Sequence, residues 1–377
     1  MPRQTSGIAV LIGTRPEAVK LMPVVRALAA AGQPPSVWVT GQHREMLEPI
    51  LAELDLRAEE HLQVMRPGQS LVDLSARVLT ATRDLVARKR PRALVVEGDT
   101  TSVAMGALAA YYEGVGVAHV EAGLRTGDKY QPFPEEINRR VLGAVGDLHF
   151  APTHWASDNL LREGIPQERI VVTGNTVIDA LHDIVERPID LSQGSLAGLD
   201  NALQIILVTA HRRENFGGPM ARIFQALRTI ADEYSGRAYL IYPVHLNPNV
   251  QEPAHRLLGD VPNIRLIEPL DYLSMVHLMK RAHLILTDSG GIQEEAPALG
   301  KPVLVLREVT ERPEALQAGT AILVGTDTER IVQETRRLMD DPEAYAAMAR
   351  AVNPFGDGHA AERIVEALLI RHASLSQ

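Results

Sequence analysis

Cysteine is absent from the 377-residue sequence. This absence excludes a disulfide framework, a thiolate nucleophile, an iron–sulfur cluster and a cysteine-based zinc site. An excess of cationic residues is absent too, because 38 Lys and Arg stand against 47 Asp and Glu, a formal charge of −9. Nucleic-acid-binding proteins usually present a basic surface to phosphates, so we expect no nucleic-acid partner. A small anionic ligand is compatible with this charge, since a few local cations suffice to bind it.

Long apolar runs and several ligand-binding motifs are also missing. No stretch approaches the roughly 18 apolar residues of a membrane-spanning helix, and the first apolar run is too short for the core of a signal peptide. We therefore expect no membrane association and a cytoplasmic location. The sequence has no GxxxxGK[ST] motif, no GxGxxG after its first predicted strand and no HExxH motif. It thus predicts no ATP-hydrolysing phosphate loop, no nicotinamide site and no metal site, and we expect no cofactor.

Short aliphatic runs alternate with longer amphipathic stretches in two successive blocks, a pattern typical of parallel sheets covered by helices. The predicted strands are Ile8–Ile12, Val37–Thr40, Ala93–Val96, Val117–Val120, Ile170–Thr173, Ile205–Thr209, Ala238–Tyr242, Ile264–Ile267, Leu284–Thr287, Val303–Leu306 and Ile322–Val324. The predicted helices include Leu71–Lys89, Glu135–Val145, Tyr272–Arg281 and Ala360–His372. We predict an α/β protein of two Rossmann-like, doubly wound domains facing a cleft, residues 1–185 and 200–355, with a C-terminal segment, 356–377, that packs back on the first domain.

The first turn between a strand and a helix carries two cations. Arg15 stands at a helix N-terminus, where the helix dipole disfavours a positive charge, and Lys20 lies one turn further on. This placement favours an anionic ligand, because ligands of doubly wound sheets bind beyond the carboxyl ends of the strands. The alternative for the same turn is purely structural, a capping box formed by Thr14 and Glu17.

Three carboxylates follow strands or begin helices in the first domain. Asp99 and Glu121 come directly after predicted strands, and Glu135 opens a helix. Each also has a structural interpretation: Asp99 as a helix N-cap, Glu121 as an ion-pair partner of Arg125, and Glu135 as a favourable charge at a helix N-terminus. Convergence of the three at one site would instead suit acid–base chemistry.

The second domain contains a predicted nucleotide site. His211 and Arg212 follow a buried strand directly, and His245 lies in a second turn of this kind. The strand before Ser289-Gly290-Gly291 runs straight into a helix, where backbone N–H groups and the helix dipole favour a phosphate. Glu295, one turn into that helix, suits ribose hydroxyls, and Arg312 could balance the charge of a nucleoside diphosphate.

Long motifs in collinear order cover nearly the whole chain. They are GTRPEA (13–18), GQHR (41–44), VEGDTTS (96–102), HVEAGLRTGD (119–128), PFPEEINR (132–139), TGNTVID (173–179), TAHRREN (209–215), YPVH (242–245) and the segment 286–314 that begins LTDSGGIQEE. In these motifs the chain resembles the non-hydrolysing UDP-N-acetylglucosamine 2-epimerase family. The resemblance implies the GT-B fold, a homodimer and reversible conversion of UDP-GlcNAc to UDP-ManNAc, which would supply ManNAc for cell-surface polysaccharides.

The resemblance also implies a mechanism without NAD or metal, in which UDP is eliminated to give 2-acetamidoglucal and then adds back. Carried over by motif, the catalytic residues are Asp99, Glu121, Glu135 and His211. The UDP-binding residues are Arg15, Lys20, Met275, Ser289, Gly290, Gly291, Glu295 and Arg312. A second, allosteric UDP-GlcNAc site falls on Gln42, Arg66, Arg212 and His245.

Two other interpretations share parts of this pattern. One keeps the fold and the UDP-sugar but changes the reaction, to a hydrolysing epimerase or a GT-B glycosyltransferase. The other is a nucleotide-sugar sensor without activity, which would be expected to lack a key carboxylate, and none is missing.

Overall fold

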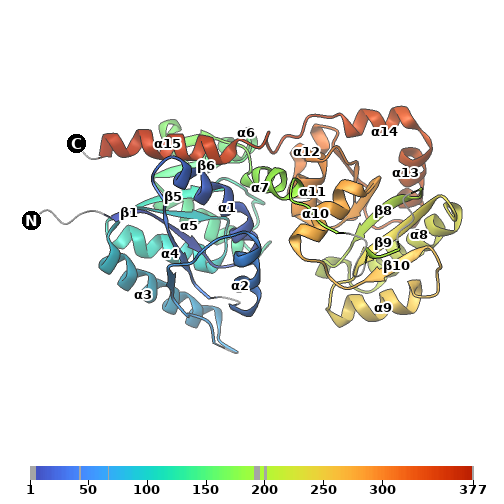
Figure 1. Cartoon of the computed structure of the whole chain (residues 1–377), viewed down its shortest axis with the longest axis horizontal. Helices are drawn as coiled ribbons and strands as arrows, with labels where there is room; N and C mark the ends of the chain where they lie inside the picture. Colours follow the sequence, from blue (N-terminus) through green and yellow to red (C-terminus); the bar gives the residue numbers. More distant parts are fainter. Residues whose placement is uncertain (1–5, 42–43, 67, 191–195, 199–201, 376–377) are drawn as a thin grey trace, which may run out of the picture. The chain divides into compact units, whose positions relative to one another are not determined.

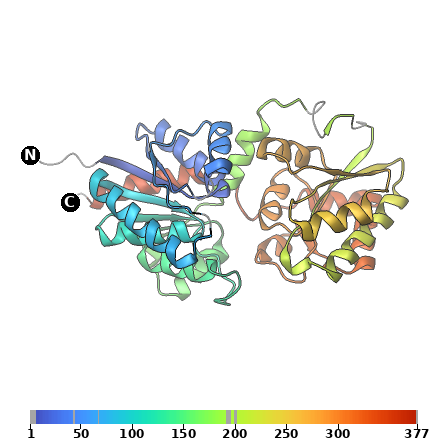
Figure 2. The same cartoon turned by 90° about the horizontal axis from the view of Figure 1, so that it is seen from below.

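The computed structural model describes residues 6–41, 44–66, 68–190, 196–198 and 202–375. The chain forms two compact units, each built around its own sheet (Figures 1 and 2). Unit 1 comprises Met1–Ala180 and Phe355–Gln377, and unit 2 comprises Leu181–Pro354. Within the described residues, no helix combines the length and the apolar character that crossing a membrane requires.

Unit 1 contains a parallel sheet whose strand order is β3-β2-β1-β4-β5-β6-β7 among the described residues. Its strands are β1 (Ser6–Ile12), β2 (Ser36–Val39), β3 (Glu60–His61), β4 (Pro91–Glu97), β5 (Gly116–Val120), β6 (Leu148–Ala151) and β7 (Ile170–Val172). The central strands are buried on both faces, as their continuous apolar sequence predicts. The direction of strand addition reverses between β1 and β4, and such a switch point is where doubly wound sheets bind ligands.

Helices cover both faces of this sheet. They are α1 (Arg15–Ala30), α2 (Arg44–Glu53), α3 (Leu71–Lys89), α4 (Thr101–Tyr112), α5 (Glu135–Val145), α6 (His154–Arg162) and α7 (Thr176–Val185), with the short 3₁₀ helix η1 (Gln167–Arg169). Helix α4 contacts both α3 and α5. Helices α3 and α4 are the light-blue and cyan helices in front of the sheet in Figure 2. Helix α1 contacts α2 and the C-terminal helix α15 (Ala360–Leu375).

The chain returns to unit 1 at its C-terminal end, where α15 lies beside the N-terminal unit (Figure 1). The backbone N–H of Asn175 donates to the carbonyl of Phe355 at 2.6 Å. Asp179 accepts from the first N–H groups of α15, those of Ala360 at 3.2 Å and Ala361 at 2.8 Å. A carboxylate at this position satisfies helix N–H groups that have no partner within the helix, so it fixes where α15 begins.

Unit 2 repeats the same order in a parallel sheet, β10-β9-β8-β11-β12-β13 within the described residues. Its strands are β8 (Gln204–Thr209), β9 (Ala238–Pro243), β10 (Ile264–Ile267), β11 (Leu284–Thr287), β12 (Val303–Val305) and β13 (Ala321–Leu323). Its helices are η3 (Arg213–Asn215), α8 (Gly218–Glu233), α9 (Pro248–Leu258), α10 (Tyr272–Arg281), α11 (Gly290–Ala298), α12 (Pro313–Gln317), α13 (Thr328–Asp340) and α14 (Pro342–Ala349).

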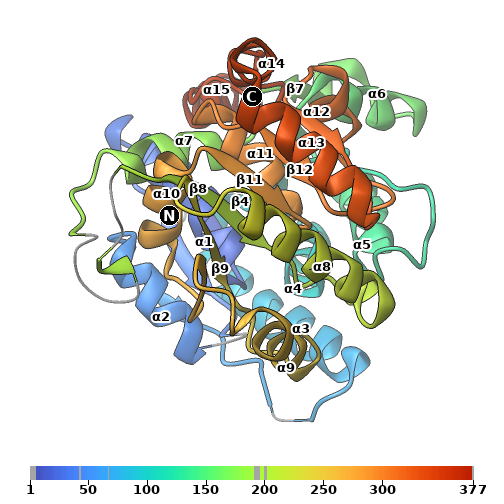
Figure 3. The ribbon, with the colours of Figure 1, turned by 90° about the vertical axis from the view of Figure 1, so that its right-hand side faces the viewer.

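The core of unit 2 lies between this sheet and the helices α8, α9 and α13. Helix α8 contacts α9 on one side and α13 on the other, and the three lie side by side in Figure 3. Their apolar faces and the alternate residues of the strands form one buried cluster that includes Phe224, Tyr242 and Leu286. The switch point falls between β8 and β11, so the turns after these two strands are the expected ligand edge.

Candidate active site

The turn after β1 is organised by the buried carboxyl of Glu17. This side chain accepts hydrogen bonds from the backbone N–H of Gly13 at 2.5 Å and from the hydroxyls of Thr14 and Thr100, each at 2.9 Å. Burial raises the pKa of Glu17 to about 7, against the opposing effect of these hydrogen bonds. Because Thr100 belongs to the turn after β4, Glu17 links the two turns that flank the switch point.

The capping box predicted for this turn forms only in part. Thr14 occupies the N-cap position of α1, but its hydroxyl donates to Glu17 and does not cap the helix. Arg15 is the first residue of α1 and is exposed. The cation therefore stands at the helix N-terminus, as the sequence places it.

Lys20 joins two carboxylates at the ends of neighbouring strands. Its Nζ lies 3.1 Å from Oε1 of Glu97 and forms a short contact with Oε2 of Glu121. Glu121 has a φ of 61°, an unusual left-handed conformation for a residue other than glycine. The predicted pairing of Glu121 with Arg125 is wrong, because Arg125 binds both carboxylate oxygens of Glu163 at 2.8 Å.

Asp99 contacts helix α5. Oδ2 of Asp99 accepts from Nε of Arg139 and lies 2.8 Å from both Nε and Nη2 of that guanidinium. The side-chain amide of Asn138 donates to the Asp99 carbonyl at 2.9 Å. Asp99 is not the helix N-cap, since Thr100 holds that position and accepts from the N–H of Val103. Asp99 is therefore bound to α5, the helix that begins at Glu135.

Glu135 is half-buried at the first residue of α5. Its neighbour Glu136 is fully buried and accepts from the backbone N–H groups of Thr126 at 3.1 Å and Gly127 at 3.2 Å. Arg139 also lies 3.3 Å from Glu136. Glu136 thus fixes the preceding loop, and Arg139 connects this loop to Asp99.

In unit 2, Asp288 follows β11 and holds the turn after β8. Asp288 has no exposed surface, and its Oδ2 accepts from the backbone N–H groups of His211 and Arg212, both at 2.8 Å, and from the Asn215 amide at 3.0 Å. Its Oδ1 lies 3.6 Å from Nδ1 of His211. One carboxylate therefore fixes the backbone at His211 and lies beside its ring.

The ring of His211 lies between Asp288 and a second histidine. It stacks on the ring of His245, with centroids 5.4 Å apart and an interplanar angle of 16°. Burial lowers the pKa of His211, and nearby Arg212 and His245 lower it further, whereas Asp288 acts to raise it. The backbone N–H of Asn247 donates to Nδ1 of His245 at 3.0 Å, so the second ring is also held in place.

The Ser289-Gly290-Gly291 turn leads directly into α11. Ser289 is the N-cap residue without a side-chain capping bond, and its N–H donates to the hydroxyl of Thr287 at 2.9 Å. A Cβ on Gly290 would lie 3.1 Å from Cζ of Arg312, whereas one on Gly291 would meet nothing within 4 Å. The glycine at 290 therefore lets the guanidinium lie against the start of the helix.

Arg312 and Glu295 are both buried beside this turn. Arg312 donates from Nε to Glu294 at 2.8 Å, and its Nη1 lies 2.9 Å from Glu311. Glu295 accepts from the hydroxyl of Tyr272 at 2.9 Å. Tyr272 is the first residue of α10, which also carries the half-buried Met275.

The residues predicted for a second nucleotide site fall in both units. Arg212 and His245 lie beside His211 in unit 2, whereas Arg66 is exposed in unit 1 between β3 and α3. Gln42 lies outside the described residues.

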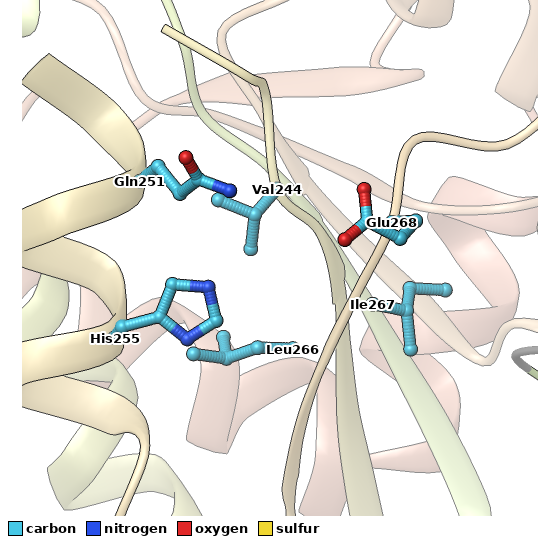
Figure 4. A pocket seen from close by; sticks show the side chains of 6 residues that line it. All are labelled: Val244, Gln251, His255, Leu266, Ile267 and Glu268. Atoms are coloured by element: carbon cyan, nitrogen blue, oxygen red, sulfur yellow. The ribbon is translucent and has the colours of Figure 1, made fainter. Parts of the chain in front are cut away.

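A cavity of about 290 Å³ opens between α9 and the end of β10 in unit 2 (Figure 4). Gln251 and His255 point into it from α9, opposite Val244, Leu266 and Glu268. None of the predicted site residues lines this cavity. Separately, the described part of the chain holds no group of three or more His, Asp or Glu side chains that could bind a metal ion.

Comparison with known proteins assigns the family. A sequence model described as UDP-N-acetylglucosamine 2-epimerase matches residues 26–369. The chain belongs to the UDP-N-acetylglucosamine 2-epimerase family. The UDP-N-acetylglucosamine 2-epimerase of Salmonella typhimurium is 51% identical over 98% of this chain and 100% of its own length. That of Escherichia coli is 49% identical over the same shares of the two chains.

Solved structures of the epimerase family agree with the fold. The crystal structure of UDP-GlcNAc 2-epimerase from Neisseria meningitidis, bound to UDP-GlcNAc, is similar with a TM-score of 0.90. It is 44% identical, and the similarity covers 97% of this chain and 100% of that one. The prediction of two Rossmann-like, doubly wound domains of the GT-B class is confirmed.

Three carboxylates of this epimerase-family chain have no site role predicted from the sequence: Glu17, Glu97 and Asp288. Glu97 ends a buried apolar strand, and Asp288 follows one directly. This position at the end of a buried strand is the sequence feature that could have identified them, because a carboxylate buried at a sheet edge requires a hydrogen-bond or ionic partner. For Glu17 the sequence indicates only a part in a capping box.

Proposed function

We propose that this chain catalyses the reversible C2 epimerisation of UDP-GlcNAc to UDP-ManNAc. The observation that carries the proposal is the sequence identity of 49–51% to UDP-N-acetylglucosamine 2-epimerases over 98% of this chain. The arrangement of Asp99, Glu121 and His211 at the ligand edges of the two sheets supports it.

The reaction has to overcome the weak acidity of the C2 proton, since no carbonyl group lies beside it in the pyranoside. In the proposed mechanism the C2–H and C1–O bonds break, a C1=C2 double bond forms, and UDP and 2-acetamidoglucal result. The C2 proton passes to a carboxylate. UDP oxygen then adds back to C1 while C2 receives a proton on the opposite face.

Asp99, Glu121 and Glu135 would supply the acid and base for these transfers. Positioned carboxyl groups of this kind contribute roughly 10²–10⁴-fold to proton-transfer steps. The environments of two of them differ, because Asp99 is bound by Arg139 and Glu121 by Lys20. Such a difference supports separate acid and base roles.

His211 would stabilise the pyrophosphate or the sugar as the anomeric bond breaks. The lowered pKa of His211 favours a neutral ring at physiological pH. The UDP site would use the Ser289-Gly290-Gly291 turn for the pyrophosphate and Glu295 for the ribose. Backbone N–H groups at the start of α11 are suited to bind an anion. Arg15, Lys20, Met275 and Arg312 complete the proposed set.

Regulation and biological context are part of the same proposal. UDP-GlcNAc would also bind a second, activating site formed by Gln42, Arg66, Arg212 and His245, in a homodimer. The product would supply ManNAc for cell-surface polysaccharides, in the cytoplasm.

The decisive experiment follows UDP-GlcNAc in D₂O by NMR. Formation of UDP-ManNAc with deuterium at C2 supports the proposal, whereas free sugar plus UDP would indicate a hydrolysing epimerase. Transfer of the sugar to an added acceptor would indicate a glycosyltransferase, and unchanged substrate would indicate a sensor.

Amide substitutions test the carboxylates individually. We expect Asp99→Asn and Glu121→Gln each to abolish C2 exchange, with the exposed Glu168→Gln as a control for the loss of one charge in the same unit. Normal exchange in either site variant would refute the role of that residue.

A further inference from the structure

Glu97 and Glu121 form a carboxyl pair that the proposed reaction uses only in part. Glu97 is the last residue of β4, and its register partner in β5 is Val120. Glu121 follows immediately, and its left-handed backbone, with φ of 61°, directs it to the same lysine as Glu97. Lys20 reaches both carboxylates from α1.

The charges of this group do not balance if both carboxyls are ionised. The side chains of Glu97, Glu121 and Lys20 are 2%, 7% and 16% exposed, so the group is largely withdrawn from water. Two carboxylates and one ammonium would leave a net negative charge there. Two carboxylates that share a buried site commonly retain one proton between them for this reason.

The other groups that face the pair do not remove the imbalance. Glu17, on α1, adds acidic character, and burial raises its own pKa to about 7. The Asn175 amide, which precedes α7, donates to Oε2 of Glu121 at 3.4 Å but carries no charge. Burial raises the pKa of Glu97 well above its usual value, Lys20 opposes this, and the negative charge of Glu121 raises it further.

We propose that Glu97 is a positioning residue that shares one proton with Glu121 beside Lys20, so that the pair carries a single negative charge in the resting protein. This inference rests on the proposed function, in which Glu121 is one of the carboxyls that exchange a proton with C2. When Glu121 accepts the C2 proton, the pair holds two protons and no charge. When it returns a proton to C2, the pair again holds one.

Infrared spectroscopy in D₂O tests the shared proton without using activity. At neutral pH, the difference between the wild-type and Glu97→Gln proteins should contain the C=O stretch of one protonated carboxyl, which disappears as the pH is raised. The same band should be lost in Glu121→Gln, because Glu97 would then form a simple ion pair with Lys20. Glu168→Gln serves as the matched control and should leave the band unchanged.

Two infrared results would overturn the proposal. If no protonated carboxyl is lost in Glu97→Gln, both carboxylates are ionised beside Lys20. If the band persists in Glu121→Gln, the proton belongs to Glu97 alone and is not shared. Because each variant tests the band separately, failure of one to fold leaves the other informative.

Kinetics provides a second readout. The side-chain amide introduced by Glu97→Gln can donate to Glu121 but cannot ionise, so this variant mimics the singly protonated pair at every pH. We expect kcat/KM within about tenfold of wild type at neutral pH and loss of the alkaline decline that release of the shared proton causes. An equal fall in rate at all pH values, with the decline retained, would indicate a merely structural role. Inactive wild-type protein would refute the proposed function and leave the infrared test of the pair intact.

Discussion

Substitution of the two adjacent glycines of α11 should have opposite effects on stability. A Cβ added at Gly290 would lie 3.1 Å from Cζ and 3.2 Å from Nη1 of Arg312. A Cβ added at Gly291 would meet no heavy atom within 4 Å. Neither glycine has a positive φ, so alanine can adopt the backbone conformation at both positions.

The expected magnitudes follow from these contacts. Replacing a helical glycine with alanine stabilises by up to about 1 kcal/mol, and this gain is common to both variants. At position 290 the methyl group must displace a guanidinium that is held by Glu294 and Glu311 and is 10% exposed. Overpacking of this kind costs about 1–3 kcal/mol. We therefore expect Gly290→Ala to be about 2 kcal/mol less stable than Gly291→Ala.

Urea unfolding followed by far-UV circular dichroism measures this difference. Tryptophan fluorescence is unsuitable, because both tryptophans, Trp38 and Trp155, lie in unit 1, whereas the substitutions are in unit 2. Equal unfolding free energies for the two variants would refute the reasoning, since they would mean that Arg312 moves aside at no cost. A double variant with Arg312→Ala should remove most of the difference, because the group that the methyl displaces is then absent.

Two further predictions concern buried carboxyls. Burial raises the pKa of Glu17 from 4.5 to about 7, so the folded protein binds more protons than the unfolded chain between these pH values. The unfolding free energy of the wild type should therefore fall relative to that of Glu17→Gln as the pH rises, by up to about 3 kcal/mol. Parallel curves of unfolding free energy against pH for the two proteins, measured by tryptophan fluorescence, would contradict this. Asp288→Asn should lower the pKa of His211, since it removes the negative charge that acts to raise it. The same substitution should lower the free energy of unfolding by about 1–3 kcal/mol, because three charge-assisted hydrogen bonds become neutral. An unchanged NMR titration of the His211 ring, assigned with His211→Gln, would refute the first effect.

Periodicity was enough to predict most of the fold, and several of the missed elements have identifiable causes. Helices α3, α5 and α10 begin and end at the predicted residues. Strand β3 has only two residues, both polar, and β6 includes His149, which is fully buried and whose pKa burial lowers to about 4. Helices α2 and α9 were missed, and each contains an internal proline. A two-residue polar strand contains no aliphatic run, and an internal proline weakens the helical signal of a short segment.

The turns that carry the candidate site residues could be located from the sequence, but the partners of these residues could not. The turns after the strands could be read from sequence because a buried run followed by glycine, serine or a carboxylate marks a sheet edge. The partners of Lys20 and Asp99 could not, since Glu121 and Arg139 are 101 and 40 residues away in sequence. Such pairs are decided by the order of the strands and by the direction of α5, which only the fold specifies.

These partners change how a diphosphate would be bound. The residues predicted to bind UDP include three cations, Arg15, Lys20 and Arg312. In the described structure Lys20 is paired with two carboxylates and Arg312 with Glu294 and Glu311. Around the start of α11, side-chain charge alone therefore provides little attraction for an anion. The backbone N–H groups at this N-terminus and the helix dipole would then contribute a large share of the attraction for a diphosphate, while the carboxylates orient Arg312. Binding would then depend more on preorganised geometry than on an excess of positive charge.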